Sequence, residues 1–259
     1  MSGTRYPLFN SFKTLIIHSF CLSAICLMVS CNNTKENESW AETAKELPEE
    51  VKMPISEYET SMINQGLVNL KSLDSTLIID LKYSTEDNFF GQDVYGSFAN
   101  AYMQKDPASA LVLANKNLKQ TNPNLRLVIY DAARPHRIQQ ILWDKLESIP
   151  PKRRKDFVAD PEEGSIHNYG CAVDLSIFDL TQNQALDMGT KYDYFGDLAY
   201  PRLEEKLLSE GKLTSEQVEN RKILRNAMEK AGYQPISSEW WHFNFYSRKT
   251  AKAKYEIVD

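Results

Sequence analysis

The sequence shows no excess of positive charge and so lacks the main mark of a nucleic-acid-binding protein. Its 30 Lys and Arg residues are outnumbered by 35 Asp and Glu residues, and the formal net charge is -5 at pH 7. Because phosphate backbones are bound by clustered basic side chains, no nucleic-acid partner is expected. The composition, 42% hydrophobic and 25% charged, is ordinary for a globular chain and suffices for one sizeable core.

The apolar stretch LIIHSFCLSAICLMVS, at residues 15–30, is too short for a membrane-spanning helix, which needs roughly 20 residues. It follows the weakly basic start of the chain and precedes Cys31, an arrangement that resembles a bacterial lipoprotein signal. We therefore expect residues 1–31 to be a signal with Cys31 as the acylated N-terminus of an exported, membrane-anchored protein on the periplasmic or outer-membrane side. An ordinary secretory signal, giving a soluble secreted or periplasmic protein, and a short membrane anchor are the alternatives.

Cysteine is scarce beyond this signal. Cys21 and Cys26 leave with it, so the exported chain keeps Cys31 and Cys171, and its body has no internal disulfide available. Residues 32–61 are polar, acidic and interrupted by proline, which is typical of a flexible tether. Residues 62–259 contain no second linker and no repeat, and they are expected to form one catalytic domain.

The order of predicted elements in this domain is mixed. Strands are expected at 77–83, 125–130 and 240–246. Helices are expected at 106–119, with Asp106 as N-cap and Pro107 as first helical residue, at 135–148, and at 215–231, ending at Gly232. Because this is not a regular βαβ alternation, we expect an α+β fold with a central, mainly antiparallel sheet flanked by helices.

Histidine is also scarce, since only His136, His167 and His242 follow the signal. In GSIHNYGCAVDLSI, His167 precedes Asp174 by seven residues, and Gly170 can turn the chain into a strand on which Ala172, Asp174 and Ser176 share one face. An aspartate among small and apolar neighbours is costly to bury unless it is paired or binds a cation.

SSEWWHFNFY places Glu239 three residues before His242, with two tryptophans between them. On a regular strand this odd spacing points the two side chains to opposite faces, so we expect Glu239 at a bend or bulge just before the strand. Trp240 and Trp241 are expected to exclude water, which raises the pKa of a carboxyl group toward values useful for a general base.

Two imidazoles and one carboxylate are a common ligand set for catalytic zinc and leave a fourth position for water. Zinc lowers the pKa of that water, and a nearby carboxylate that is not a ligand, here Glu239, takes its proton. Taken singly, each residue has a plainer explanation, such as a hydrogen-bonded core histidine or an aspartate that caps a loop. A non-haem iron site is the rival metal centre, but its histidine and carboxylate usually lie two residues apart.

Two further segments carry polar groups suited to a site. YDAARPHRIQQ places Arg134 where a strand gives way to a helix, where its guanidinium can stabilise an oxyanion or simply pair with Asp131. The loop LDMGTKYDYFGD, at residues 186–197, is rich in acidic and aromatic groups. It is suited to a cationic amine, and a solvated turn is the alternative.

Together these segments resemble the zinc D-alanyl-D-alanine dipeptidases of the vancomycin-resistance type, in the larger group of peptidoglycan D,D-peptidases. The resemblance rests on five motifs in order between Asp80 and Tyr246: DLKYSTEDNFFG, YDAARP, SIHNYGCAVDL, MGTKYDYF and SSEWWHF. It implies one Zn²⁺ per chain and the hydrolysis of the dipeptide D-Ala-D-Ala in peptidoglycan metabolism. The signal and tether depart from the cytoplasmic resistance enzymes and indicate a role outside the cytoplasmic membrane.

The resemblance also implies a role for each residue that matches a motif. Zinc is expected on His167, Asp174 and His242, with Glu239 as general base and Arg134 as oxyanion stabiliser. Ser165 is expected to face the carboxylate of the dipeptide and Asp193 its ammonium group, while Tyr83 and Asp131 line or order the pocket.

Two rival functions use the same residues. A D,D-carboxypeptidase would trim D-alanine from longer stem peptides in an open cleft, so the dependence on Asp193 separates it from a dipeptidase. A non-catalytic cell-wall-binding lipoprotein would keep zinc for structure only, and a closed shell with His136 as fourth ligand would favour it.

Overall fold

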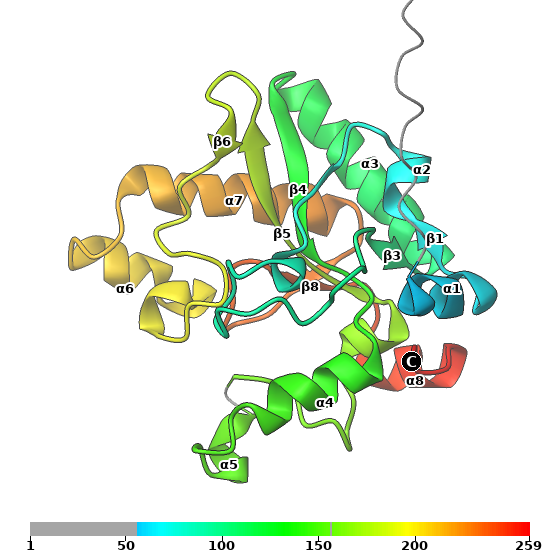
Figure 1. Ribbon diagram of the computed structural model, residues 1–259. Coiled ribbons are helices and arrows are strands. Elements are labelled where there is room, and N and C mark those ends of the chain that lie inside the picture. The colour runs from blue at the N-terminus through cyan, green and yellow to red at the C-terminus, as the bar shows by residue number, and fades with distance from the viewer. Residues whose placement is uncertain (1–55, 156) are drawn as a thin grey trace, which may run out of the picture. The chain divides into compact units, whose positions relative to one another are not determined.

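The computed structural model describes residues 56–155 and 157–259 (Figure 1). The predicted signal, Cys31 and all but the end of the predicted tether lie outside these residues. The first helix, α1 (Glu57–Asn64), begins inside the range predicted as tether, so that boundary was placed too late. A capping box explains the helix start, because the Ser56 hydroxyl accepts from the Glu59 N–H and the Glu59 carboxylate accepts from the Ser56 N–H.

Helices and strands alternate irregularly along the described chain. The other helices are α2 (Leu70–Leu73), α3 (Lys105–Thr121), α4 (His136–Asp144), α5 (Pro151–Arg154), α6 (Glu204–Ser209), α7 (Ser215–Lys230) and α8 (Arg248–Lys254). The strands are β1 (Val68–Asn69), β2 (Ile78–Ile79), β3 (Tyr102–Met103), β4 (Leu125–Asp131), β5 (Ala172–Asp179), β6 (Gln184–Ala185), β7 (Gln234–Pro235) and β8 (His242–Asn244). Short 3-10 turns, among them η1 (Lys82–Ser84) and η2 (Ile166–Tyr169), connect several of them.

The main sheet has six strands in the order β2-β4-β5-β8-β7, with β6 added to the end of β5. Its pairs are antiparallel except for β2 with β4, and a separate antiparallel pair joins β1 to β3. The predicted α+β fold with a mainly antiparallel sheet flanked by helices is therefore confirmed.

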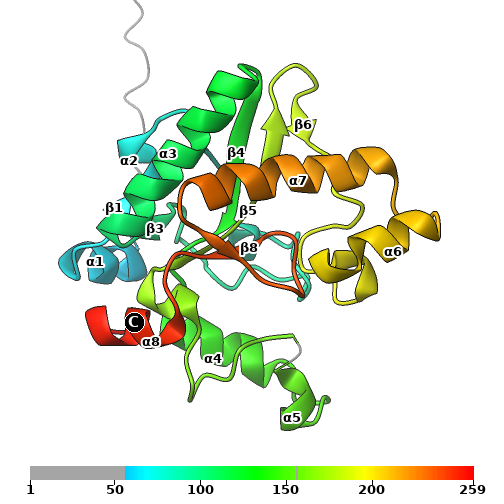
Figure 2. The same cartoon turned by 180° about the vertical axis from the view of Figure 1, so that it is seen from behind.

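The two long helices cover one face of this sheet. Figure 2 shows α3 and α7 lying across β4 and β5, where α3 contacts β4, α7 contacts β5 and the two helices contact each other. Leu127 and Ile129 of β4, Leu175 of β5 and Phe243 of β8 are almost fully buried in one hydrophobic core. Each large apolar side chain removed from water in this way contributes about 1.5–3 kcal/mol.

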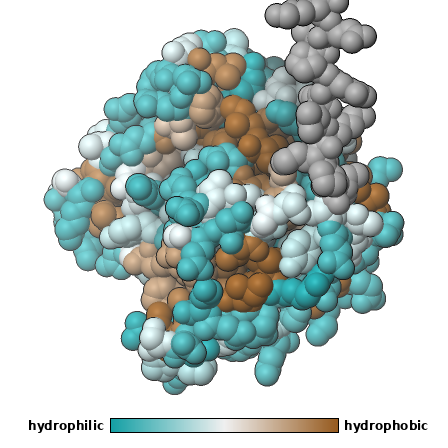
Figure 3. Space-filling model, in the orientation of Figure 1, coloured by the Kyte–Doolittle hydropathy of each residue, from teal (hydrophilic) through white to brown (hydrophobic). Residues whose placement is uncertain are grey.

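The opposite face of the sheet carries the connecting loops. In Figure 1 the segments near residues 80–100 and 186–197 pass over this face, away from α3 and α7. Figure 3 shows the surface from this side, with hydrophobic residues gathered mainly near the middle and hydrophilic ones around them. Because side chains alternate along a strand, β5 sends Leu175 into the core and Asp174 toward these loops.

Several predicted element boundaries differ from the structure. The strand expected at 77–83 is limited to β2, and its last residues form the turn η1, which carries Tyr83. Helix α3 begins at Lys105 with Gln104 as its N-cap, so the cap predicted at Asp106 is wrong; the Ala108 N–H already bonds to the Gln104 carbonyl. The strand expected at 240–246 is reduced to β8 because the tryptophans lie in a bend.

The remaining predicted elements agree more closely. β4 and α7 match the strand expected at 125–130 and the helix expected at 215–231 to within one residue at either end. Gly232 follows α7 with φ +94°, a left-handed conformation that glycine adopts without strain. Helix α4 begins at His136 but ends at Asp144, short of the predicted end at 148. No helix among residues 56–155 and 157–259 is both long and apolar enough to cross a bilayer.

A partly buried polar network around Asp74 ties α2 to α3, and we expect it to make stability depend on pH. Its carboxylate accepts from the Asn115 amide (2.8 Å), from Lys119 Nζ (3.1 Å) and from the Thr76 backbone and hydroxyl groups. Burial raises the pKa of Asp74, but these donors outweigh it and hold the pKa well below its ordinary value. A depressed folded-state pKa stabilises the fold above the unfolded pKa near 3.8, and this contribution is lost as pH falls through the folded value.

Asp74→Asn is therefore expected to lower the free energy of unfolding by about 1–2 kcal/mol at pH 7, with a smaller loss below about pH 4. Chemical denaturation with metal removed measures this difference. The matched control is Asp87→Asn, because Asp87 pairs with Lys82 at 2.7 Å but its side chain is 65% exposed. An exposed pair of this kind contributes about 0–1 kcal/mol. Equal losses in both variants, or a loss that does not shrink in acid, would contradict the assignment.

Candidate metal centre and active-site cavity

The sheet itself brings the central polar groups into one row. In the strand register, Asp131 of β4 lies opposite Asp174 of β5, and Asp174 lies opposite His242 of β8. A register irregularity between Ile129 and Asp131 shifts the end of β4. Three residues that are far apart in sequence are thereby placed side by side on neighbouring strands.

His167 reaches this row from the turn η2. Ser165 caps the turn, because its hydroxyl accepts from the His167 N–H (3.3 Å). In return, the Asn168 side-chain oxygen accepts from the Ser165 N–H (2.6 Å). Gly170 ends the turn with φ +64° and leads into β5, as its place in the sequence predicted. A side chain at Gly170 would meet Leu67 and the Gln104 backbone at 3.0 and 3.2 Å, so glycine is required both by the turn and by the packing.

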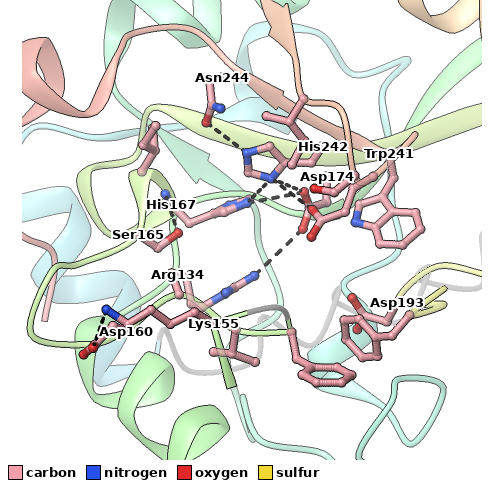
Figure 4. Close-up of a pocket in the computed structure, with 18 of the residues that line it drawn as sticks. Arg134, Lys155, Asp160, Ser165, His167, Asp174, Asp193, Trp241, His242 and Asn244 are labelled. Carbon is pink, nitrogen blue, oxygen red and sulfur yellow. Dashed lines mark hydrogen bonds and ion pairs between the residues drawn. The ribbon is translucent and has the colours of Figure 1, made fainter. Parts of the chain in front are cut away.

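The two imidazoles and the Asp174 carboxylate converge on one point (Figure 4). His167 Nε2 lies 3.1 Å from His242 Nδ1 and 3.3 Å from Asp174 Oδ1, and His242 Nδ1 lies 2.9 Å from the same oxygen. Two donors of a tetrahedral zinc site with bonds of 2.0–2.1 Å are separated by about 3.3 Å. The spacing of these three atoms therefore fits the ligand triangle of such a metal.

In each imidazole, the outer nitrogen, which points away from the cluster, is hydrogen-bonded to the protein. This bond fixes the orientation of the ring and leaves the inner nitrogen facing the site. His167 Nδ1 lies 2.7 Å from the Ala132 carbonyl, and His242 Nε2 lies 2.9 Å from Asn244 Oδ1. Because both oxygens are acceptors, the donor role is assigned to these two nitrogens, so the nitrogens that face the site can offer lone pairs to a metal. Two lone pairs and a carboxylate oxygen repel one another at these distances unless a cation lies between them. The donor set thus fits a divalent metal ion.

The electrostatics of Asp174 and His242 agree with a cation-binding cluster. Burial opposes ionisation of Asp174, but the two histidines outweigh it and hold its pKa well below the ordinary value. Burial likewise lowers the pKa of His242, whereas the hydrogen bond to Asp174 and the charges of Asp174 and Glu239 raise it to about 9. In a protein without a metal, a proton would therefore occupy the position that a cation fills.

Glu239 lies beside this cluster without belonging to it. Its Oε2 is 3.9 Å from His242 Nδ1, and it precedes β8 in an irregular segment, as the odd spacing predicted. Burial raises the pKa of Glu239; His242 opposes this shift and Asp174 adds to it. Trp240 and Trp241 are only 5% and 2% exposed, but the Glu239 side chain is 26% exposed and lines the cavity, so the exclusion of water from Glu239 stays a prediction.

Arg134 pairs with Asp131, which is one of the two interpretations that its sequence position allowed, while its role toward an oxyanion stays a prediction. Its Nε and Nη2 donate to Asp131 Oδ2 at 2.9 and 2.6 Å, and Nη1 donates to Gln139 Oε1 at 2.9 Å. Its Nη2 also lies 3.8 Å from Asp174 Oδ2, so the guanidinium borders the metal cluster. These bonds use three of the five N–H groups and leave a fixed, buried cation with donors to spare.

A cavity of about 750 Å³ opens over these groups. Its walls include five residues that the resemblance assigned to metal binding or catalysis: Arg134, His167, Asp174, Glu239 and His242. Tyr83, Ser165 and Asp193 also line it, whereas Asp131 is fully buried behind Arg134 and accepts from the Tyr95 hydroxyl at 2.6 Å. Asp131 thus orders the pocket rather than lining it.

Asp193 and Tyr83 stand together in the wall of the cavity. The Tyr83 hydroxyl donates to Asp193 Oδ2 at 3.0 Å. Burial raises the pKa of Asp193 well above its ordinary value, and the negative charge of Asp174 adds to this shift. A carboxyl group in this state gains most from a cation placed next to it. Its φ of +56° is left-handed, which Asp and Asn tolerate better than most other residues.

His136 takes no part in the metal cluster. Its Nε2 lies 3.0 Å from the Pro161 carbonyl, and the potential metal-binding group found in the described chain consists of His167, Asp174 and His242. A closed shell with His136 as fourth ligand is therefore absent from the described residues.

Sequence reasoning missed several residues that support the site. Asn244, which orients His242, follows it by two residues, so the alternation of a strand would have placed both on one face. The Tyr192 hydroxyl donates to Asp174 Oδ2 at 2.9 Å, and no local spacing indicates that contact. Gln139 and Asn168 also bond within the site, to the Arg134 side chain and the Arg134 carbonyl respectively.

The sequence comparisons with known proteins identify D-alanyl-D-alanine dipeptidases. A family model described as D-ala-D-ala dipeptidase matches residues 63–257. A D-alanyl-D-alanine dipeptidase of Escherichia coli strain K12 is 34% identical over 68% of this chain and 83% of its own length. One from Enterococcus faecium is 27% identical over 63% of this chain and 83% of its own length. Among solved structures, the LdcB LD-carboxypeptidase has a TM-score of 0.35 and 22% identity, covering 59% of this chain and 63% of that one.

Proposed function

The chain belongs to the family of D-ala-D-ala dipeptidases, and from this premise we propose that it is a zinc-dependent enzyme. In this proposal it hydrolyses D-alanyl-D-alanine to two D-alanine molecules in peptidoglycan metabolism. The observation that carries the proposal is the converging triangle of His167, Asp174 and His242, whose inner nitrogens are fixed as lone-pair donors. With the family model, this triangle supports a metallopeptidase site with an open position toward the cavity.

In the proposed reaction, a zinc ion on these three residues would polarise the peptide carbonyl and lower the pKa of water. The Glu239 carboxylate removes the proton of the attacking water and returns it to the nitrogen of the departing D-alanine. Arg134 presents its spare N–H groups to the oxygen that becomes negative in the transition state. Trp240 and Trp241 are themselves buried, and we propose that they limit the access of bulk water to Glu239 during its proton transfers.

Two cavity residues suit the two ends of a free dipeptide. Asp193, supported by the Tyr83 hydroxyl, gains a cationic partner when an ammonium group binds there. Ser165 also lines the cavity, as do the cationic side chains of Lys155 and Arg248, and Ser165 is proposed to face the substrate carboxylate. A substrate held at both termini would be a short peptide with both ends free.

A D,D-carboxypeptidase that trims stem peptides is the second candidate, because of the size of the cavity. A volume of about 750 Å³ is in the range of pockets that enclose drug-sized ligands, well above the size of a dipeptide of alanine. The non-catalytic binding protein has less support, since the closed metal shell that would favour it is absent from the described residues.

We also propose that the protein is exported and anchored through an acylated Cys31. This proposal rests on the sequence of residues 1–31, which lie outside the described residues. Its substrate would then be dipeptide or stem-peptide ends outside the cytoplasmic membrane.

The deciding experiment compares D-Ala-D-Ala, its N-acetylated form and a stem pentapeptide as substrates of the zinc-loaded protein, with and without chelator. We expect cleavage of the free dipeptide that chelator abolishes and zinc restores. Asp193→Asn, which retains the left-handed backbone, is expected to lower kcat/KM for the dipeptide by about 10²-fold, as loss of a charge-assisted bond predicts.

Asp197→Asn is the matched control for this variant, because Asp197 is an exposed acid near the end of the same loop. Two results together would move the assignment to carboxypeptidase. The unmodified protein would cleave the acetylated or long substrate faster than the free dipeptide, and Asp193→Asn would lower kcat/KM equally for all substrates. If none of the three substrates is cleaved, the proposed peptidase reaction is wrong.

A further inference from the structure

We infer that Tyr192 is a positioning residue whose hydroxyl holds the outer oxygen of Asp174, so that this carboxylate presents a single oxygen to the metal and the metal is tied to the loop that carries Asp193. The inference rests on the proposed function, because it gives Asp174 the role of a metal ligand.

The two oxygens of Asp174 have separate surroundings. Oδ1 faces the histidines, at 2.9 Å from His242 Nδ1 and 3.3 Å from His167 Nε2. Oδ2 accepts the Tyr192 hydroxyl at 2.9 Å, whereas Arg134 Nη2 stays at 3.8 Å, beyond hydrogen-bond distance. Within the described chain, the short contact that turns Oδ2 away from the histidines therefore comes from Tyr192.

The Tyr192 ring is fixed independently of this hydrogen bond. It packs against the rings of Trp241, Tyr130 and Tyr83, with centroid distances of 5.5, 5.3 and 6.2 Å. Aromatic pairs at such distances are favourable and resist rotation of the ring. A phenylalanine at this position would keep the packing and lose only the hydroxyl, which makes the hydrogen bond testable by itself.

Tyr192 also connects the metal cluster to the other end of the substrate. It is followed directly by Asp193, and Tyr83 contacts both residues, through its ring and its hydroxyl respectively. The loop before Tyr192 is held elsewhere, because Trp240 Nε1 donates to Thr190 Oγ1 at 2.7 Å and Arg221 Nε donates to the Met188 carbonyl at 2.7 Å. The Tyr192 hydroxyl is thus a direct link between this anchored loop and a metal ligand.

Partners that orient a metal ligand typically change metal affinity by about 10–100-fold when they are removed. Tyr192→Phe is therefore expected to weaken zinc binding by about 10–100-fold in competition with a chromophoric chelator. Its cobalt-loaded form is expected to show weaker visible absorption, because a freed Oδ2 allows Asp174 to bind through both oxygens and raises the coordination number. At saturating zinc, kcat for D-Ala-D-Ala should fall while KM changes little, since the packed ring keeps Asp193 in place.

Tyr194→Phe is the matched control. Tyr194 lies in the same loop, and its side chain is 43% exposed, so its zinc affinity and cobalt spectrum should equal those of the unmodified protein. Equal zinc affinity and identical cobalt spectra in Tyr192→Phe and the unmodified protein would overturn the inference and leave the proposed function standing. Failure of the unmodified protein to bind one zinc ion per chain would overturn both.

Discussion

Glu239→Gln is expected to lower kcat for D-Ala-D-Ala by about 10³-fold while zinc still binds at one ion per chain. A positioned acid or base contributes typically 10²–10⁴-fold, and glutamine has the same shape but cannot take a proton from water. The carboxylate lies 3.9 Å from His242 Nδ1, outside the ligand triangle, so its replacement removes a proton acceptor and leaves the metal ligands in place. Steady-state kinetics and metal analysis of the same preparation measure both effects.

The control for this variant is Glu163→Gln. Glu163 lines the same cavity, but its side chain is 56% exposed and paired with Lys155 at 2.6 Å on the rim. Its replacement should change kcat by less than about 3-fold, since an exposed ion pair contributes little. Near-full activity in Glu239→Gln would show that another group accepts the proton. Loss of zinc together with activity would instead make Glu239 part of the metal shell.

The sequence predicted the members of this site better than it predicted how they meet. Scarcity of histidine selected His167 and His242, and the odd spacing of Glu239 and His242 required the bend that the structure contains. Local patterns have no information on register, however, and the row formed by Asp131, Asp174 and His242 depends on pairing between strands far apart in the chain.

The groups that orient the metal ligands could not be predicted from the sequence for a related reason. A backbone carbonyl such as that of Ala132 has no residue-type signature, and any residue at this position offers the same oxygen to His167. Tyr192 stood inside a motif that the sequence analysis singled out, but its contact with Asp174 spans 18 positions and depends on how the loop folds over the sheet. Boundaries failed where tertiary contacts overrode local preference, as at η1, where the chain leaves the sheet and carries Tyr83 toward the site.

The second large effect is expected at Arg134, whose position gives it two roles that must be separated. It balances the charge of the fully buried Asp131 through two bonds, and it is the cation that we propose to stabilise the oxyanion. Removing it alone would leave Asp131 unpaired, which destabilises a fold by about 3–5 kcal/mol. A simple alanine variant would therefore lose activity whether or not the guanidinium acts on the substrate.

Two variants distinguish these roles. Arg134→Lys retains the charge but not the forked donor geometry, and we expect kcat to fall by about 10²-fold with little change in KM. The double variant Arg134→Gln with Asp131→Asn removes both charges, so no unpaired carboxylate remains, and its thermal unfolding should lie closer to that of the unmodified protein than that of Arg134→Gln alone. If the guanidinium acts on the transition state, the double variant stays at least 10²-fold below the unmodified kcat although its stability recovers. Recovery of activity together with stability would limit Arg134 to balancing Asp131.

Arg202→Lys is the control for these variants and should retain near-full activity. Arg202 lines the cavity, but it stacks on Tyr200, with its guanidinium 4.2 Å from the ring centroid.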